Sequence, residues 1–157
     1  MIDSFVSADD TRYDERAHAL VRIGQDAIAV ENDAALDDYF AEDFAFHGPG
    51  AEMKLDGLKA FFASMRHSFS GFSCERREII SAGAFLAART TMSGVFENRF
   101  DESPIGPVEP NGATVTLELI NLFRYDADGR LAEEWVQYDN LDFLRQMGVK
   151  LVPTVAG

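Results

Sequence analysis

The spacing of apolar residues changes once along the chain, near Gly71, and this change limits the folds that the chain can adopt. Before Gly71, apolar residues recur every three or four positions, which predicts helices over 10–31 and 57–69 and a shorter helix starting at Asp33. After Gly71, apolar and polar residues alternate, as they do in strands with one buried face. The order therefore predicts an α+β fold in which helices cover one face of a curved sheet.

The second half of the chain supplies most of the predicted sheet. We expect long strands at 72–81, 84–96, 113–125 and 130–139, and a short strand within 43–50. The Asp-Gly sequence at 126–129 predicts a hairpin turn. The segment 97–112 is a long loop for a compact domain, and such loops are usually functional or mobile. A short helix over 140–147 is expected to end at Gly148.

Length and charge indicate what kind of protein this is. With 157 residues, of which 46% are hydrophobic, we expect a single domain over 1–157, with loose tails at 1–9 and 149–157. The chain has 14 Lys and Arg residues against 27 Asp and Glu residues, so its net charge is −13. An acidic protein is repelled by nucleic acids and anionic membranes, and we expect neither as a partner.

Cysteine, histidine and glycine usage argues against several kinds of site. Cys74 is the single cysteine, so no internal disulfide is possible and a reducing, cytoplasmic setting is expected. The acidic start of the chain does not look like a secretory signal, and no apolar run is long enough to span a membrane. His18, His47 and His67 do not have metal-ligand spacing, and the glycine-rich nucleotide motifs are missing. We therefore expect neither a metal nor a cofactor.

The stretch EEWVQYD, residues 133–139, is the most informative local pattern. Strand alternation places one set of side chains on one face, namely Glu133, Trp135, Gln137 and Asp139, and the set Glu134, Val136 and Tyr138 on the other. A tryptophan between acids suggests the wall of a polar pocket with a working carboxylate, Asp139, at its end. In the alternative interpretation, Asp139 or Asn140 caps the helix that follows.

Four segments together resemble a known family. They are FHGPG (46–50), GLKAFFASMRHSF (57–69), AARTTMSG (87–94) and LFRYDADGRLAEEWVQYDNLDFLRQMG (122–148). The chain resembles the SnoaL-like polyketide cyclase (ester cyclase) family of the NTF2-like superfamily over residues 15–148. The resemblance implies a cone-shaped barrel whose curved antiparallel sheet packs on the N-terminal helices. The superfamily includes cyclases, dehydratases, isomerases, epoxide hydrolases and pure binding modules, so fold does not settle function.

The resemblance also implies roles for individual residues. In the cyclases, an aspartate at the end of the last strand is the acid/base of an intramolecular aldol closure, and Asp139 occupies that place. His47, Arg89 and Asn121 match polar positions of the family. Family members often read GTH where this chain has Gly94-Val95-Phe96, a departure that leaves room for a pocket without cyclase activity.

The residue types at these positions suit proton transfer. His47 is expected either to polarise a substrate carbonyl and orient Asp139, or to bond to the backbone at a turn. Trp135 either stacks on a flat ligand or belongs to the core. Glu133 and Arg89 can form an ion pair inside the barrel. The candidate substrate-binding set is Trp135, Glu133, Gln137, Arg89, Asn121, Phe61 and Met65, of which the last two sit on a helical stripe that is more often core.

The expected function is a cofactor-independent acid/base enzyme of the cyclase, isomerase or dehydratase type. Its substrate would be a small hydrophobic, polyketide-like carbonyl compound, with Asp139 and His47 as catalytic residues. Long strands with one uncovered face favour a homodimer. Two alternatives remain: a binding module without turnover, and a dimerising scaffold whose cavity is vestigial.

Overall fold

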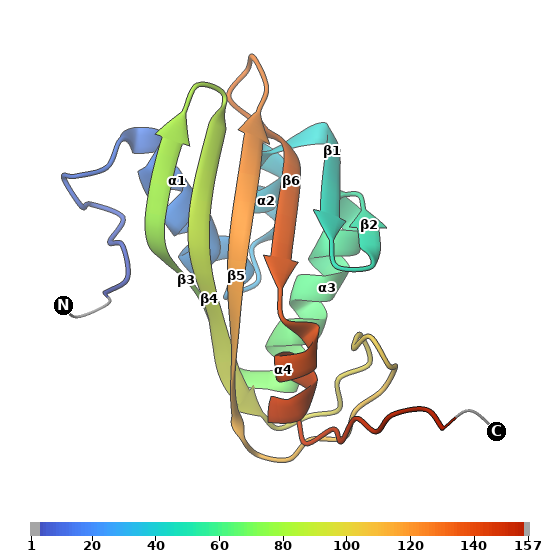
Figure 1. The fold of residues 1–157 in the computed structure, drawn as a ribbon. Coiled ribbons are helices and arrows are strands. Elements are labelled where there is room, and N and C mark those ends of the chain that lie inside the picture. Colours follow the sequence, from blue (N-terminus) through green and yellow to red (C-terminus); the bar gives the residue numbers. More distant parts are fainter. Residues whose placement is uncertain (1–3, 156–157) are drawn as a thin grey trace.

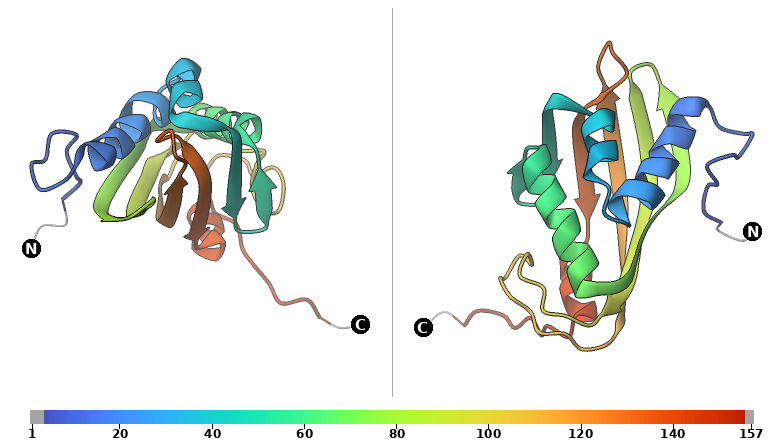
Figure 2. Two further views of the ribbon diagram at one scale, coloured as in Figure 1. Left: turned by 90° about the horizontal axis from the view of Figure 1, so that it is seen from above. Right: turned by 180° about the vertical axis from the view of Figure 1, so that it is seen from behind.

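The computed structural model describes residues 4–155 as helices packed on one face of a curved sheet (Figures 1 and 2). The helical elements are α1 (Glu15–Ile23), the π-helix η1 (Gly24–Ile28), α2 (Asp33–Tyr39), α3 (Leu55–Ser68) and α4 (Asn140–Gln146). Figure 2 shows α1, α2 and α3 together on one face of the sheet, whereas α4 follows the end of the last strand. The predicted α+β class with segregated helices is confirmed.

Six strands form one open sheet in the order β2-β1-β6-β5-β4-β3. They are β1 (Phe40–Gly48), β2 (Ala51–Met53), β3 (Phe69–Ala82), β4 (Phe85–Phe96), β5 (Thr114–Tyr125) and β6 (Leu131–Tyr138). The sheet curves around the helices, but β2 and β3 remain as edges, so it is not a closed barrel (Figure 1). The purely antiparallel sheet that we expected is wrong at one place: β1 and β6 run parallel, because α3 carries the chain across the sheet before β3 begins.

The first helix is shorter than its apolar pattern predicts. It begins at Glu15, with Asp14 as N-cap rather than Asp10 or Thr11, and the Asp14 carboxylate accepts from the backbone N–H of Ala17 at 2.9 Å. At Gly24 the α-helix gives way to the π-helix. This glycine lies against β3 so closely that a Cβ atom there would sit 2.8 Å from the backbone oxygen of Cys74. The close approach brings α1 down onto the sheet.

A cluster of phenylalanine rings packs at the end of the sheet where β3 begins and β4 ends. The rings of Phe69 and Phe96 stack with centroids 5.1 Å apart, and Phe100 packs edge-on against Phe69 and Phe143. Phe100 belongs to the predicted loop 97–112 and is only 1% exposed. The loop is therefore anchored to the core, and Phe96 belongs to the core rather than to the pocket.

The expectation of a loose N-terminal tail is wrong for part of it. Val6 is buried, and its backbone N–H donates to the carbonyl oxygen of Arg76 at 2.7 Å, which attaches this segment to β3. Residues 1–3 lie outside the described residues, as do 156–157. At the other end, residues 151–155 are exposed and have no regular secondary structure.

Gly94 should be intolerant of a side chain, because a Cβ atom there would lie 2.7 Å from Cβ of Phe69 and 3.1 Å from the backbone oxygen of Ser70. We expect Gly94→Ala to lower the free energy of unfolding by about 1–3 kcal/mol, since β3 and β4 would have to separate. Urea denaturation followed by circular dichroism measures this change. An unchanged midpoint and slope would show that the strands give way at no cost.

Candidate functional site

A cavity lies between the helices and the concave face of the sheet. Most of its wall is apolar and comes from every helix that covers the sheet and from the central strands, with Leu20, Phe40, Phe61, Phe62, Leu119 and Phe123 among the lining residues. A concave, mostly apolar space with a few polar groups is typical of small-molecule sites.

Three buried polar side chains reach this cavity from three different strands. Arg76 on β3, Asn121 on β5 and Glu134 on β6 line it, and they are 3%, 3% and 8% exposed. Charged side chains are rarely buried to this degree unless they are paired or have a functional role. These residues are therefore the polar groups against which a ligand would be positioned.

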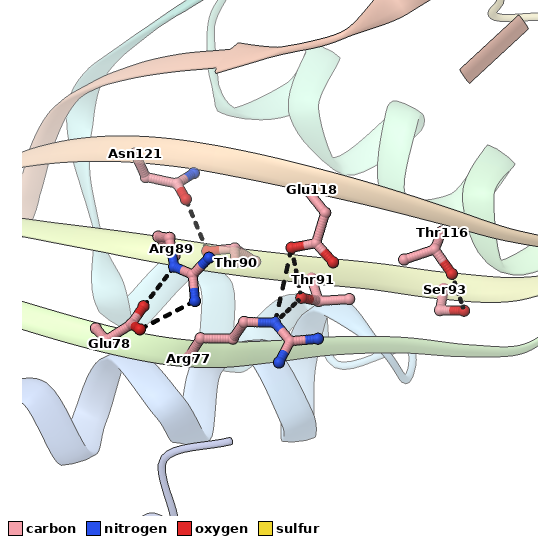
Figure 3. A network of polar contacts seen from close by, with 9 residues as sticks. All are labelled: Arg77, Glu78, Arg89, Thr90, Thr91, Ser93, Thr116, Glu118 and Asn121. Atoms are coloured by element: carbon pink, nitrogen blue, oxygen red, sulfur yellow. Dashed lines mark hydrogen bonds and ion pairs between the residues drawn. The ribbon is translucent and has the colours of Figure 1, made fainter. Parts of the chain in front are cut away.

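A chain of hydrogen bonds joins them. Nη1 of Arg76 donates to Oγ1 of Thr90 at 2.6 Å. That hydroxyl donates to Oδ1 of Asn121 at 2.7 Å, a bond drawn in Figure 3. Nδ2 of Asn121 then donates to Oε1 of Glu134 at 3.2 Å. Every donor points away from Arg76 and toward Glu134. This direction fixes the orientation of the Asn121 amide and leaves the carboxylate as the final acceptor.

The buried environment shifts the pKa of Glu134 into the neutral range. Burial raises the pKa of its carboxyl to about 7, while the charge of Arg76 and the hydrogen bond from Asn121 act in the opposite direction. Among residues 4–155, Asn121 is the only hydrogen-bond partner of this carboxylate, and no fully buried side-chain oxygen there lacks a partner. Oε2 must therefore meet open space, and the open space beside Glu134 is the cavity.

Tyrosine hydroxyls supply further donors around the cavity. Tyr39 on α2 and Tyr138 on β6 line it, and the hydroxyl of Tyr39 is hydrogen-bonded to that of Tyr125. Burial raises the pKa of Tyr125 to about 12 and also raises the pKa of Tyr39 and Tyr138. All three phenols therefore stay protonated at neutral pH and can act as donors but not as bases.

Several residues predicted for the pocket lie instead on the outward face, the face of the sheet that α1, α2 and α3 do not cover. There, Nε2 of His47 is 2.7 Å from Oε2 of Glu133, and the rings of His47 and Trp135 stack with centroids 5.4 Å apart. Glu133 also accepts from Arg124 at 3.1 Å. The first cause of the raised pKa of His47 is its hydrogen bond to Glu133. His47, Trp135, Glu133 and Arg124 are all absent from the described residues that line the cavity.

The outward face carries a ladder of polar contacts (Figure 3). Arg89 binds Glu78, with Nη2 and Oε1 2.9 Å apart, so the expected pair between Arg89 and Glu133 does not form. Thr91 joins Arg77 to Glu118 through hydrogen bonds of 2.8 Å and 2.9 Å. These contacts tie β3, β4 and β5 together at the surface.

Asp139 is placed as a helix cap. Its Oδ1 accepts from the backbone N–H of Asp142 at 3.0 Å, which makes it the N-cap of α4, and its side chain is exposed. This geometry is the alternative that the sequence left open. Gln137 is likewise exposed and points away from the cavity wall. Catalytic roles for Asp139 and His47 stay predictions, because the structure gives their position and not their chemistry.

Three residues of the predicted set do lie in the interior. Asn121 and Phe61 line the main cavity, and Met65 is buried beside a smaller hollow next to Phe69. Sequence reasoning missed Arg76, Thr90, Glu134 and Tyr138. A usable signal existed for Glu134: like Asn121, it is a polar residue on an otherwise apolar strand face, between Ala132 and Val136.

Comparison with protein-family models gives a match over residues 18–147, and the matching model is the SnoaL-like polyketide cyclase. The chain belongs to the SnoaL-like polyketide cyclase family. The match spans every residue of the hydrogen-bond chain from Arg76 to Glu134, so the site described above lies inside the family domain. It also confirms the resemblance noted from the sequence. A search of the curated proteins gave no match.

Solved structures show the same fold. IdmH of Streptomyces antibioticus, a proposed polyketide cyclase, matches with a TM-score of 0.69 and 21% identity over 87% of this chain and 100% of that one. AclR of Streptomyces galilaeus, a proposed hydroxylase, matches with a TM-score of 0.72 and 18% identity over 88% and 85% of the two chains. A proposed SnoaL-like polyketide cyclase from Jannaschia sp. CCS1 gives 0.72 and 16%, over 87% and 93%. At these identities the likeness concerns fold alone.

Two further findings concern membranes and metals. Within residues 4–155, no helix has the length and apolar character needed to cross a bilayer. In the same part of the chain, no three side chains of the His, Cys, Asp or Glu type gather closely enough to hold a metal ion.

The raised pKa of Glu134 predicts a pH-dependent stability. Because the folded-state pKa, about 7, lies above the ordinary value of 4.5, the folded protein binds a proton that the unfolded chain releases between these values. This contribution is full below pH 4.5 and is lost as the pH rises through 7. Between pH 5 and pH 8 the wild type should lose about 2–3 kcal/mol more unfolding free energy than Glu134→Gln. Denaturant titrations of both proteins at each pH measure the difference, and parallel curves would contradict a raised pKa.

Proposed function

We propose that this protein is an acid/base enzyme of the cyclase or isomerase type, acting on a small apolar carbonyl compound, with Glu134 as the proton-transferring group. One observation carries the proposal. Glu134 is a buried carboxyl with a pKa of about 7 that lines an apolar cavity, and within residues 4–155 only its Oε1 accepts a hydrogen bond, from Asn121. Proton transfer is most efficient when the pKa of the catalytic group lies near the working pH.

The proposed chemistry begins with the ionised form of Glu134. Oε2 removes a proton from a carbon next to a substrate carbonyl, and the carbonyl oxygen takes up the negative charge. In a cyclase the resulting carbon nucleophile bonds to a second carbonyl carbon, whose oxygen is then protonated by the neutral carboxyl. In an isomerase the proton returns to another carbon. A single positioned group of this kind contributes about 10²–10⁴-fold to the rate.

The surrounding residues have supporting roles. Asn121 holds one carboxylate oxygen, so the other keeps a fixed direction. Tyr138, whose pKa is raised by burial, is a permanent donor that can hydrogen-bond to the developing oxyanion. The apolar wall excludes water from the carbon acid. Because these residues suffice for proton transfer, we propose a cofactor-independent reaction.

Family membership supports the substrate class. The family takes its name from polyketide cyclases, and IdmH of Streptomyces antibioticus is itself a proposed polyketide cyclase. Polyketide-like compounds carry repeated carbonyl groups beside acidic C–H bonds, which is the chemistry that a buried carboxylate can use. The mostly apolar wall of the cavity fits the hydrophobic body of such molecules.

Two amide substitutions separate Glu134 from the residue favoured by the sequence. Glu134→Gln keeps the shape and the hydrogen bond but cannot take a proton, so turnover of a carbonyl substrate should fall by at least 100-fold. Asp139→Asn still caps α4 and should retain turnover within about threefold. A panel of β-polyketone esters, followed by mass spectrometry of the products, provides the measurement.

The opposite pattern, in which Asp139→Asn is inactive and Glu134→Gln is active, would restore Asp139 as the acid/base. Saturable binding of the compounds without any product would favour the alternative function, a non-catalytic binding module.

We propose further that the protein is a homodimer formed through the outward face. Ile120 and Leu122 of β5 are 58% and 40% exposed there, and Leu122 pairs in register with Trp135. Large apolar residues grouped on an uncovered sheet are typical of subunit interfaces.

Light scattering after size exclusion should therefore give twice the chain mass of 17.4 kDa. Leu122→Glu should yield monomers, because a charge would be buried in the interface. Ile105→Glu changes an exposed isoleucine in the loop and should leave the dimer intact. A monomeric wild type would contradict the proposal.

A further inference from the structure

Arg76 is a buried cation without a carboxylate in contact. Its side chain is only 3% exposed, and within residues 4–155 its polar contacts are limited to the carbonyl oxygen of Leu20, at 3.5 Å, and the hydroxyl of Thr90. Glu134 affects it electrostatically but is separated from it by Thr90 and Asn121. Buried charges are usually paired directly, so Arg76 lacks the direct ion-pair contact expected for a cation in this position.

The guanidinium also has donors to spare. It carries five N–H groups, and the contacts with Leu20 and Thr90 use Nε and Nη1. In the described part of the chain, no fully buried side-chain nitrogen is left without a partner. Nη2, which makes no such bond there, therefore meets open space, and the open space that Arg76 lines is the cavity.

A purely structural role accounts for only part of this geometry. Nε of Arg76 reaches the carbonyl of Leu20 near the end of α1, and the guanidinium lies over the ring of Phe123, 5.5 Å from its centroid. These contacts attach α1 to the sheet through one edge and one face of the group. These contacts do not use the edge of the guanidinium that carries Nη2, and this edge is suited to bind an oxyanion.

We propose that the ligand of this cavity is an apolar molecule carrying one anionic oxygen group, a carboxylate or an ionised enol, which binds the Nη2 edge of Arg76. The inference rests on the cavity of the proposed function and names its substrate class: acidic carbonyl compounds rather than neutral ones. Arg76 then orients the anionic end, and the carbon next to the carbonyl lies toward Glu134.

Protonation of Glu134 should control this binding. The other groups around it are Arg76 and Cys74 from β3, Tyr39 from α2, and Tyr125 and Tyr138 from the sheet. Burial raises the pKa of the thiol and of the three phenols. Glu134 is thus the group that changes charge near neutrality. Above its pKa of about 7, its carboxylate repels an anionic ligand and competes for the field of Arg76, so the ligand binds most tightly to the neutral form. The bound complex must then release the Glu134 proton before the carboxylate can remove a proton from carbon.

A matched pair of probes tests the proposal by calorimetry or fluorescence titration. We expect 2-naphthoate to bind at pH 6 at least tenfold more tightly than 2-naphthamide, which has the same shape without the charge. The affinity for 2-naphthoate should fall about tenfold between pH 6 and pH 8, because binding is linked to one proton. Arg76→Met should abolish the preference for the carboxylate, whereas Arg99→Met, at an exposed arginine, should preserve it.

Two variants keep the test decisive. Glu134→Gln should retain the carboxylate preference and lose its decline above pH 7, even though we expect this variant to be inactive as an enzyme. Arg76→Lys keeps the charge, and it serves if Arg76→Met does not fold. Equal affinity of wild-type protein for the two probes, or no saturable binding of 2-naphthoate, would overturn the inference. Active Glu134→Gln that still prefers the carboxylate would overturn the proposed function alone.

Discussion

The burial of Glu134 is the constraint on which the rest of the site depends. Removing a carboxyl from water costs free energy, and the protein limits that cost in two ways: the carboxyl keeps its proton at a higher pH, and it accepts a hydrogen bond from Asn121. Asn121 is in turn held by Thr90, and Thr90 by Arg76. Because each member satisfies the next, the four residues behave as one unit spanning β3 to β6.

The two faces of the sheet have different electrostatic settings. On the outward face, Glu133 and His47 form an ion pair with side chains 25% and 29% exposed, and hydrogen bonding lowers the pKa of Glu133. On the concave face, the neighbouring residue Glu134 is buried and its pKa is raised. Two adjacent glutamates thus have opposite shifts, because one faces water and a cation while the other faces an apolar cavity. Solvent-exposed pairs of the first kind contribute little to stability, whereas a group of the second kind is suited to proton transfer.

Much of the fold could be predicted from local patterns, and the candidate site only in part. The helical stripe of α3, the Asp-Gly turn before β6 and the glycine after α4 each have a local cause, and each was located within a few residues. The parallel pairing of β1 with β6 joins segments that are far apart in sequence, and no local pattern specifies it. Asn121 was identified because a lone amide on an apolar face is unusual. Arg76 was not, because a buried arginine and an exposed one look the same in a sequence.

The sequence by itself determined the order of helices and strands, the alternation of each strand and the family, since these depend on residues close together or on similarity along the whole chain. It also placed Glu134 and Trp135 on opposite faces of one strand. Only the tertiary structure decided which of those faces is inside. Val136 pairs in register with Asn121, and packing of the apolar face of β5 against the helices turns Glu134 toward the cavity and Trp135 toward solvent. The physical reason is that burial is a property of the assembled sheet, and the pKa of a carboxyl follows its burial.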